Sequence, residues 1–128
     1  NFAESVKRYK DLLIKNIEVL LESNEKLGGY GAPAKGNTLL NYLNLNSNHL
    51  VAIADNTIEK IGRITPGSHI PVVSDEEFSK LGISTALLLS WNYHEFFREN
   101  STFYNAGGKF LVPFPYPRID AKGLTFEN

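Results

Sequence analysis

The sequence predicts an α/β domain built on a mostly parallel sheet. Three apolar runs, "HLVAIAD" (residues 49–55), "ISTALLLSW" (83–91) and "KFLVPFP" (109–115), are each bounded by polar residues or proline. Segments with helical spacing lie between them, and this alternation is typical of a parallel sheet. Right-handed crossovers would place helices on both faces of the sheet and give a Rossmann-like three-layer α/β/α sandwich.

The first element that we expect is an amphipathic helix over residues 2–23. Apolar side chains recur there at spacings of three and four residues, which keeps them on one face of a helix. They are Phe2, Val6, Tyr9, Leu13, Ile17 and Leu20. We expect this face to pack on the sheet or to join the domain to a preceding one.

The next segments alternate between strand and helix. A strand is expected near residues 26–30, then a tight glycine turn and a helix over about residues 36–45. Residues 49–55 read as a buried strand, because the run is apolar and continuous. A loop containing the turn signal "TPG" follows, and residues 70–73 form a short strand.

An acidic cluster follows at residues 75–77. Ser74 precedes it and Glu77 stands three residues further on, which is the pattern of a capping box at a helix start. We therefore interpret the cluster as the beginning of a short helix and not as a pair of catalytic carboxylates.

The C-terminal part repeats the alternation. Residues 83–91 are the strongest predicted strand, and residues 92–106 read as a helix ended by Gly107 and Gly108. A third core strand is expected over 109–115, where three prolines stop it. A final strand at "RID" and an irregular tail complete the prediction.

The length of 128 residues suits one domain, with a leading helix at 1–24, a core at 25–118 and a tail at 119–128. The chain holds no methionine, even at its first position. We therefore expect it to be a fragment of a longer protein.

Composition excludes several classes of function. The net charge of −1 argues against a nucleic-acid binder, because neutralising phosphates needs a basic excess. The chain has no cysteine, so disulfides and thiolate metal sites are excluded, and its three histidines lack metal-ligand spacing. No run approaches the ~18 apolar residues of a membrane span, and no signal peptide is visible. We expect a cytoplasmic protein with no metal, nucleic-acid or membrane partner in this domain.

The stretch "GGYGAPAKGNTLLNY" (residues 28–42) is the strongest candidate for a ligand site. A strand, a glycine turn and a helix together form an anion site, because glycine allows close approach and the helix N-terminus offers unpaired N–H groups. Pro33 suits the approach to the first helical turn, and Lys35 could supply a mobile cation.

Two phosphate motifs were tested against this stretch. The Walker pattern fails, because Asn37 and Thr38 stand where lysine and serine or threonine are needed. The dinucleotide pattern G-x-G-x-x-G/A fits in part, with Gly29, Gly31 and Ala34. Asp55, at the end of the next strand, stands close to where a ribose-binding acid belongs. A nucleotide-type ligand and a purely structural turn stay equally open on this pattern.

Residues after the fourth strand form a further candidate. "SWNYHE" (residues 90–95) directly follows a central strand, where ligands of open α/β sheets bind. The aromatic residues there are interpreted mostly as core, whereas Asn92 and Glu95 could face a cleft.

Three stretches together resemble one known family. They are "GYGAPAKGNTLLNY" (29–42), the segment from Asp55 to Val72 that contains "TPGSHIPV", and "LLLSWNYHEFF" with "GGKFLVPFP". Their order and content, from about Lys26 to Pro117, resemble the C-terminal domain of the sugar C-methyltransferases. Those proteins use S-adenosylmethionine to methylate a carbon of a nucleotide-linked deoxysugar.

The resemblance implies a protein of three parts: a zinc-binding domain, a methyl-donor domain and this Rossmann-like domain. It implies that S-adenosylmethionine and zinc belong to the absent parts, together with the catalytic residues. The partners implied are a nucleotide-diphosphate sugar and the methyl-donor domain of the same protein. The residues that match the family's motifs, and so are implied to bind substrate, are Gly29, Tyr30, Gly31, Ala32, Pro33, Lys35, Gly36, Asn37, Asp55, Lys60, Pro66, Gly67, Trp91, Asn92 and Glu95.

Departures from the family pattern bear on the sugar rather than on the fold. Ser90 stands where the family usually has alanine before Trp91, and "YHEFF" replaces an aliphatic segment.

The sequence supports three hypotheses. The first is a substrate-binding and structural domain of a nucleotide-sugar C-methyltransferase, inactive alone. The second is a stand-alone NAD-type dinucleotide module, which rests on the glycine loop and Asp55. The third is a scaffold that binds nothing.

Overall fold

The computed structural model describes residues 1–123, without the side chains of Ala34 and Lys35. Twelve elements follow one another in the order that the sequence predicts, helix first and then strands alternating with helices. They are α1 (Phe2–Glu22), β1 (Leu27–Tyr30), α2 (Ala34–Tyr42), β2 (Ile53–Ala54), β3 (Val72–Val73), α3 (Asp75–Phe78), β4 (Thr85–Leu88), the 3-10 turn η1 (Trp91–Tyr93), α4 (His94–Asn100), α5 (Thr102–Asn105), β5 (Lys109–Val112) and β6 (Arg118–Ala121).

The strands form one six-stranded sheet in the order β3-β2-β1-β4-β5-β6. Neighbouring strands run parallel from β3 to β5, and only β6 is antiparallel, beside β5. β1 lies at the centre, with its residues Leu27–Tyr30 paired to Thr85–Leu88 of β4. The predicted α/β class, the mostly parallel sheet and the leading helix are confirmed.

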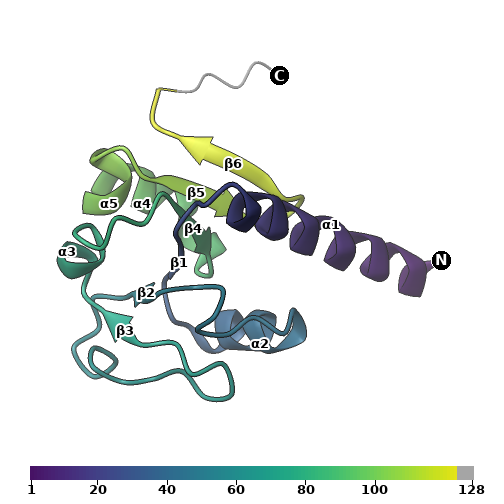
Figure 1. The fold of residues 1–128 in the computed structure, drawn as a ribbon, viewed down its shortest axis with the longest axis horizontal. Coiled ribbons are helices and arrows are strands. Elements are labelled where there is room, and N and C mark those ends of the chain that lie inside the picture. The colour runs from purple at the N-terminus through teal and green to yellow at the C-terminus, as the bar shows by residue number, and fades with distance from the viewer. Residues whose placement is uncertain (124–128) are drawn as a thin grey trace.

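Each face of the sheet carries its own apolar cluster, because side chains alternate between the faces of a strand. Leu87 and Leu111 face a cluster formed with α1 and α2, whereas Ala86, Leu88 and Phe110 face a cluster formed with α3, α4 and α5. Figure 1 shows the same division, with α1 and α2 on one side of the strands and the three short helices on the other.

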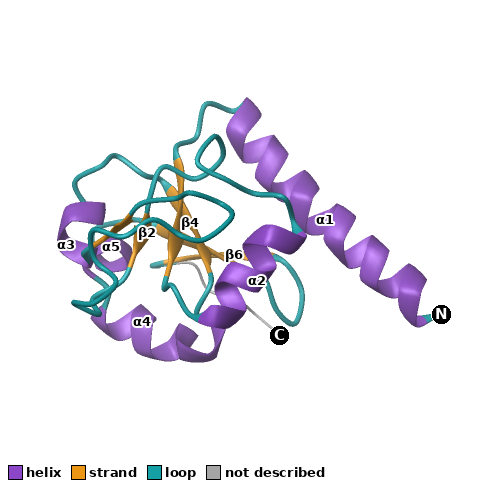
Figure 2. Cartoon of the chain, turned by 90° about the horizontal axis from the view of Figure 1, so that it is seen from below, coloured by secondary structure: helices purple, strands orange, loops and turns teal. Residues whose placement is uncertain are grey.

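Helix α1 follows the predicted amphipathic pattern from Tyr9 onward, where Tyr9 packs against the apolar cluster and stacks on Phe114. Leu13 and Ile17 are buried, whereas Phe2 is 84% exposed, so the expectation that Phe2 joins the packed face was wrong. The reason is geometric, because the N-terminal turns of α1 extend beyond the rest of the chain (Figure 2).

The predicted helix over residues 92–106 is divided into η1, α4 and α5. Ser101 breaks it with an extended backbone (φ −76°, ψ 123°) and accepts a hydrogen bond from the Tyr104 N–H through its Oγ, which makes it the N-cap of α5. The Ser74 cap of α3 formed as predicted, with Oγ accepting from the Glu77 N–H at 3.1 Å.

Strand β6 extends past residue 118, where the sequence predicted that the core ends and an irregular tail begins. β6 ends at Ala121, and Asp120 on it is 3% exposed. The rest of the predicted tail, residues 124–128, lies outside the described residues.

Candidate functional site

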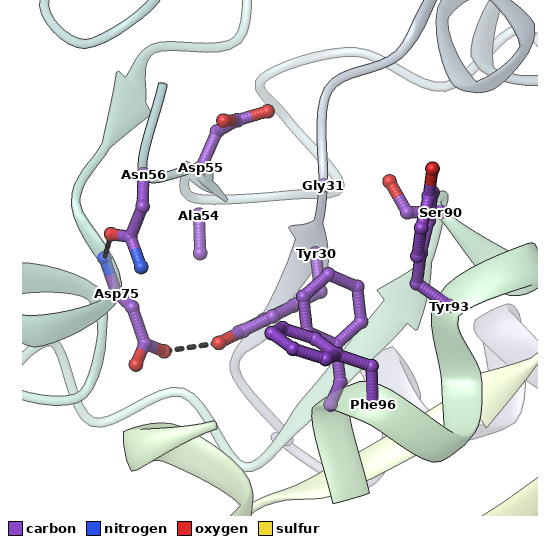
Figure 3. Close-up of a pocket in the computed structure, with 10 residues that line it drawn as sticks. Tyr30, Gly31, Ala54, Asp55, Asn56, Asp75, Ser90, Tyr93 and Phe96 are labelled. Carbon is purple, nitrogen blue, oxygen red and sulfur yellow. Dashed lines mark hydrogen bonds between the residues drawn. The ribbon is translucent and has the colours of Figure 1, made fainter. Parts of the chain in front are cut away.

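The carboxyl ends of β1, β2 and β4 meet at one edge of the sheet, as parallel strands must. Tyr30 and Gly31 lie at the end of β1, Asp55 follows β2 and Ser90 follows β4. These residues line one hollow of about 410 Å³ (Figure 3). We call it the strand-end hollow; its full lining is Tyr30, Gly31, Ala54, Asp55, Asn56, Asp75, Ser90, Tyr93, Phe96 and Phe97.

The glycines of the loop are explained first by packing within the chain. Gly31 has φ +85°, and a Cβ there would lie 2.0 Å from the Ser90 Oγ. A Cβ on Gly36 would lie 2.8 Å from the Cβ of Leu89, so this glycine lets α2 approach β4 closely. Gly29 lies in β1, where its absent side chain leaves room for Ile53 and Leu89.

Asp55 holds the glycine loop in place. Its carboxylate is 12% exposed and accepts the Ala32 N–H at 2.9 Å through Oδ2 and the Thr57 N–H at 2.8 Å through Oδ1. Lys60 completes the arrangement, because its Nζ donates to the Ala32 carbonyl at 2.8 Å and lies 3.9 Å from Asp55 Oδ2. Both backbone groups of Ala32 are therefore engaged within the protein.

The floor of the hollow is a buried tyrosine–carboxylate pair. The Tyr30 hydroxyl donates to Asp75 Oδ1, and the Thr102 N–H donates to Asp75 Oδ2 at 2.8 Å. Burial, and then the bond to Asp75, raise the pKa of Tyr30 far above its ordinary value. Tyr30 therefore stays protonated and acts as a donor to a carboxylate that is only 6% exposed.

Sequence reasoning missed Asp75 as a site residue, because it interpreted the acidic cluster only as a helix start. Both interpretations describe the same residues, since Asp75 opens α3 and also faces the sheet. Its position in the first turn gave no signal that one of three consecutive acids is buried.

Aromatic side chains of η1 and α4 form one wall of the hollow. Tyr93 and Phe96 are 63% and 58% exposed, and Phe97 packs edge-on against the Tyr30 ring at 4.9 Å. The spacing 93, 96, 97 is the signal that could have found them, because it places three aromatic residues on one helical face.

The residues that were predicted from "SWNYHE" lie elsewhere. Trp91 packs on Phe114 with ring centroids 4.7 Å apart and lines a shallow hollow beside Tyr42 of α2. Asn92 and Glu95 are exposed and do not line the strand-end hollow. Glu95 lies instead 3.8 Å from Arg98 on the same helix.

A second hollow of about 280 Å³ lies beside the same loop. Ala32, Pro33, Asn37 and Pro66 from the predicted set line it, and within the described part of the chain the buried Asn37 Oδ1 has no hydrogen-bond partner. Gly67 lies beside α2, where a Cβ would come 2.6 Å from the Asn41 Oδ1. Seven of the predicted residues thus line one or other of two hollows, with the Gly31–Pro33 loop contributing to both, and the other predicted residues whose side chains are described line neither.

Lys35, the predicted cation of the loop, is the second residue of α2, and its side chain lies outside the described residues.

Helix α4 is fixed to β6 by a buried acid. Asp120 accepts from the Tyr104 hydroxyl at 2.9 Å, and its Oδ2 lies 2.7 Å from His94 Nε2 and 3.2 Å from Arg98 Nε. Because His94 and Arg98 belong to α4, this cluster positions the aromatic wall of the strand-end hollow.

Within residues 1–123, no group of three or more histidine, cysteine or acidic side chains could hold a metal ion. No helix in that part of the chain is both long and apolar enough to cross a membrane.

A known protein family and a curated protein are similar to this chain. A family model described as "C-methyltransferase C-terminal domain" matches residues 1–115. A curated protein, C-methyltransferase NovU from Streptomyces niveus, is 34% identical over 119 residues, which cover 92% of this chain and 28% of the relative. The chain therefore spans little more than a quarter of the length of that relative.

Proposed function

This chain belongs to the family of C-methyltransferase C-terminal domains, and from that membership we propose that it is the substrate-binding and structural domain of an S-adenosylmethionine-dependent enzyme. The substrate that we propose is a nucleotide-linked deoxysugar, methylated on carbon. In this proposal the domain is inactive alone, and it binds the substrate together with a methyl-donor domain of the same protein.

The observation that carries the proposal is the strand-end hollow. Ligands of open α/β sheets bind beyond the carboxyl ends of the strands, where the strand order reverses. Here that reversal lies between β1 and β4, and the hollow opens beside both. Its volume of about 410 Å³ falls within the ~300–1,000 Å³ range of small-molecule sites.

We also propose that the fold of the chain is a Rossmann-like three-layer sandwich. The strand order and the apolar cluster on each face of the sheet support this assignment.

The chemistry requires groups that we assign to other parts of the protein. A base must remove a proton from a carbon beside a keto group, so that this carbon can attack the methyl donor. Zinc does not fit this chain, which has no cysteine and, among its described residues, no cluster of metal ligands. We propose that both zinc and S-adenosylmethionine are bound outside this chain.

The NAD-type module remains the second candidate, and the strand order favours it. The contacts of Asp55 weigh against it, because both carboxylate oxygens already accept backbone N–H groups. An acid that binds a ribose must have an oxygen turned toward the ligand.

A titration followed by two-dimensional amide NMR tests these candidates on this chain. Thymidine-diphosphate sugar, NAD and S-adenosylmethionine are added in turn. Shifts at Gly31 and Gly36 with the nucleotide-sugar alone are expected. Shifts that reach Asp55 with NAD would replace the proposal by the dinucleotide module.

The scaffold hypothesis needs a kinetic test in the methyltransferase that carries this domain. We expect Lys35→Ala to raise KM for the nucleotide-sugar about tenfold at unchanged kcat, because loop contacts would hold the ligand in ground and transition states alike. The matched control is Lys7→Ala on α1, where the lysine side chain is 79% exposed. Equal KM values in both variants, together with no NMR shift, would favour a scaffold.

A further inference from the structure

The two charged residues that line the strand-end hollow, Asp55 and Asp75, are both acids, and none of the described lining residues is a lysine or an arginine. Lys60 lies outside the lining, with its Nζ 3.9 Å from Asp55 Oδ2. A phosphate drawn into a partly desolvated hollow beside two carboxylates would be repelled by both. The hollow is therefore unsuited to the diphosphate part of a nucleotide-sugar.

The two carboxylates are also largely occupied by the protein. Asp55 accepts from the N–H groups of Ala32 and Thr57, and Asp75 accepts from the Tyr30 hydroxyl and the Thr102 N–H. They fix the shape of the hollow, and the recognition of a ligand falls to the other polar groups.

Those other groups are neutral. The Asn56 amide is oriented because its Oδ1 accepts from the Asp75 N–H at 3.0 Å, which leaves its Nδ2 as a donor with no partner among the described residues. The Ser90 hydroxyl and the Tyr93 hydroxyl likewise have no partner in that part of the chain. Figure 3 shows Asn56 on one side of the hollow and Ser90 with Tyr93 on the opposite side.

The aromatic wall supplies the remaining recognition surface. Phe96 and Tyr93 line the hollow and are each more than half exposed, although each belongs to an element that packs on the core. Exposed aromatic faces beside unpartnered amide and hydroxyl groups suit a flat, neutral ring that carries carbonyl and hydroxyl groups.

We propose that the strand-end hollow binds the nucleoside end of the ligand and excludes its phosphates. The base lies against Phe96 and Tyr93 and receives a hydrogen bond from Asn56, and the pentose lies toward Ser90. The phosphates leave the hollow over the Gly31–Pro33 loop. This inference rests on the proposed function, which supplies a nucleotide-sugar as the ligand.

The test compares ligands that contain different parts of a nucleotide-sugar. This chain is titrated separately with thymidine, adenosine, thymidine monophosphate, inorganic pyrophosphate, methyl glucoside and S-adenosylmethionine, and the amides of Asn56, Ser90 and Tyr93 are followed by NMR. We expect at least one nucleoside to shift all three amides. Addition of a phosphate should change its Kd by less than about threefold.

Other results would overturn the inference. They are shifts of the same amides by pyrophosphate, tighter binding there by the glucoside or by cationic S-adenosylmethionine, or no response to either nucleoside. A nucleotide-sugar that shifts only the Gly31–Pro33 loop would refute the nucleoside hollow and leave the proposed function standing. Nucleoside binding by a chain whose full-length protein methylates no nucleotide-sugar would refute the function and leave the hollow standing.

Variants test whether the aromatic wall itself contacts the nucleoside. Phe96→Leu is expected to weaken nucleoside binding about tenfold, and Phe2→Leu, at an 84% exposed phenylalanine far along α1, is the matched control. Asn56→Ala, in an exposed loop, is expected to weaken nucleoside binding about fivefold. This second variant keeps the proposal testable if Phe96→Leu disturbs the fold. Unchanged Kd values in both variants would contradict the proposed contacts.

Discussion

Asp55 decides between two interpretations of the glycine loop, and Asp55→Asn tests them directly. In the structure the carboxylate joins the loop to the turn after β2, through the N–H groups of Ala32 and Thr57. In the dinucleotide interpretation the same carboxylate would serve a ribose. The substitution keeps the shape of the side chain and removes one acceptor oxygen and the charge.

The expected loss of stability follows from these contacts. Asparagine can accept only one of the two N–H groups, and its amide N–H₂ would face the other. Losing one hydrogen bond to a charged group costs about 1.5–3 kcal/mol. The ion pair with Lys60, at 3.9 Å and with the lysine 42% exposed, adds at most about 1 kcal/mol. We expect the free energy of unfolding to fall by about 1.5–4 kcal/mol.

Urea unfolding followed by Trp91 fluorescence measures this loss, and amide NMR shows which N–H lost its acceptor. Asp11→Asn is the control, because Asp11 is 61% exposed and pairs only with Lys7 at 3.2 Å, so its removal should cost less than about 1 kcal/mol. If both variants unfold at the same urea concentration and the Ala32 and Thr57 amides keep their shifts, Asp55 does not hold the loop. Loss of NAD binding at unchanged stability would then restore its ribose role.

Three further perturbations probe the rest of the site. Gly31→Ala is expected to cost about 1–3 kcal/mol more than Gly62→Ala, because both glycines have a positive φ but only at Gly31 would the methyl group meet the Ser90 hydroxyl; equal melting temperatures would contradict this. Asp120→Ala is expected to cost about 2–4 kcal/mol by thermal unfolding and to shift the α4 amides, because it leaves the buried Tyr104 hydroxyl, the partly buried His94 and the exposed Arg98 without their shared acceptor. Burial raises the pKa of Tyr9 from 10.0 to about 12, so its contribution to stability is complete below pH 10 and is lost as the pH rises through 12; Tyr9→Phe should flatten the fall in melting temperature over that range.

The order of the elements along the chain and the mostly parallel sheet were predicted from the sequence, whereas the lengths of the elements were not. The apolar runs at residues 49–55 and 70–73 were read as full strands, yet the regular strands there comprise only Ile53–Ala54 and Val72–Val73, with single backbone hydrogen bonds at flanking residues such as Val51 and Asp55. Apolar composition reports burial, and it does not report which backbone groups find a partner across the sheet. The break at Ser101 is different, because a serine three residues before Tyr104 is a recognisable cap signal inside the predicted helix.

The sequence predicted which edge of the sheet these residues share, and it identified only some of the residues that line the hollow. Strand ends can be read from sequence, so Tyr30, Gly31 and Asp55 were correctly expected at one edge of the sheet. The glycine pattern could not show that Gly31 avoids Ser90, since that contact joins residues on different strands. Nor could it show that Ala32 is already held by Asp55 and Lys60, because such bonds depend on the folded path of the loop.

The contacts in the strand-end hollow also limit the chemistry that this domain can supply. A general base needs an accessible lone pair and a pKa near the working pH. Asp75 is buried beneath Tyr30, and the raised pKa of Tyr30 keeps its phenol protonated. Asp55 is bound to two backbone N–H groups, and the remaining polar groups at Asn56, Ser90 and Tyr93 are neutral donors and acceptors. Under the proposed function, a hollow of this composition would position a ligand without removing its proton, and the base that a C-methylation requires would reach the ligand from outside it.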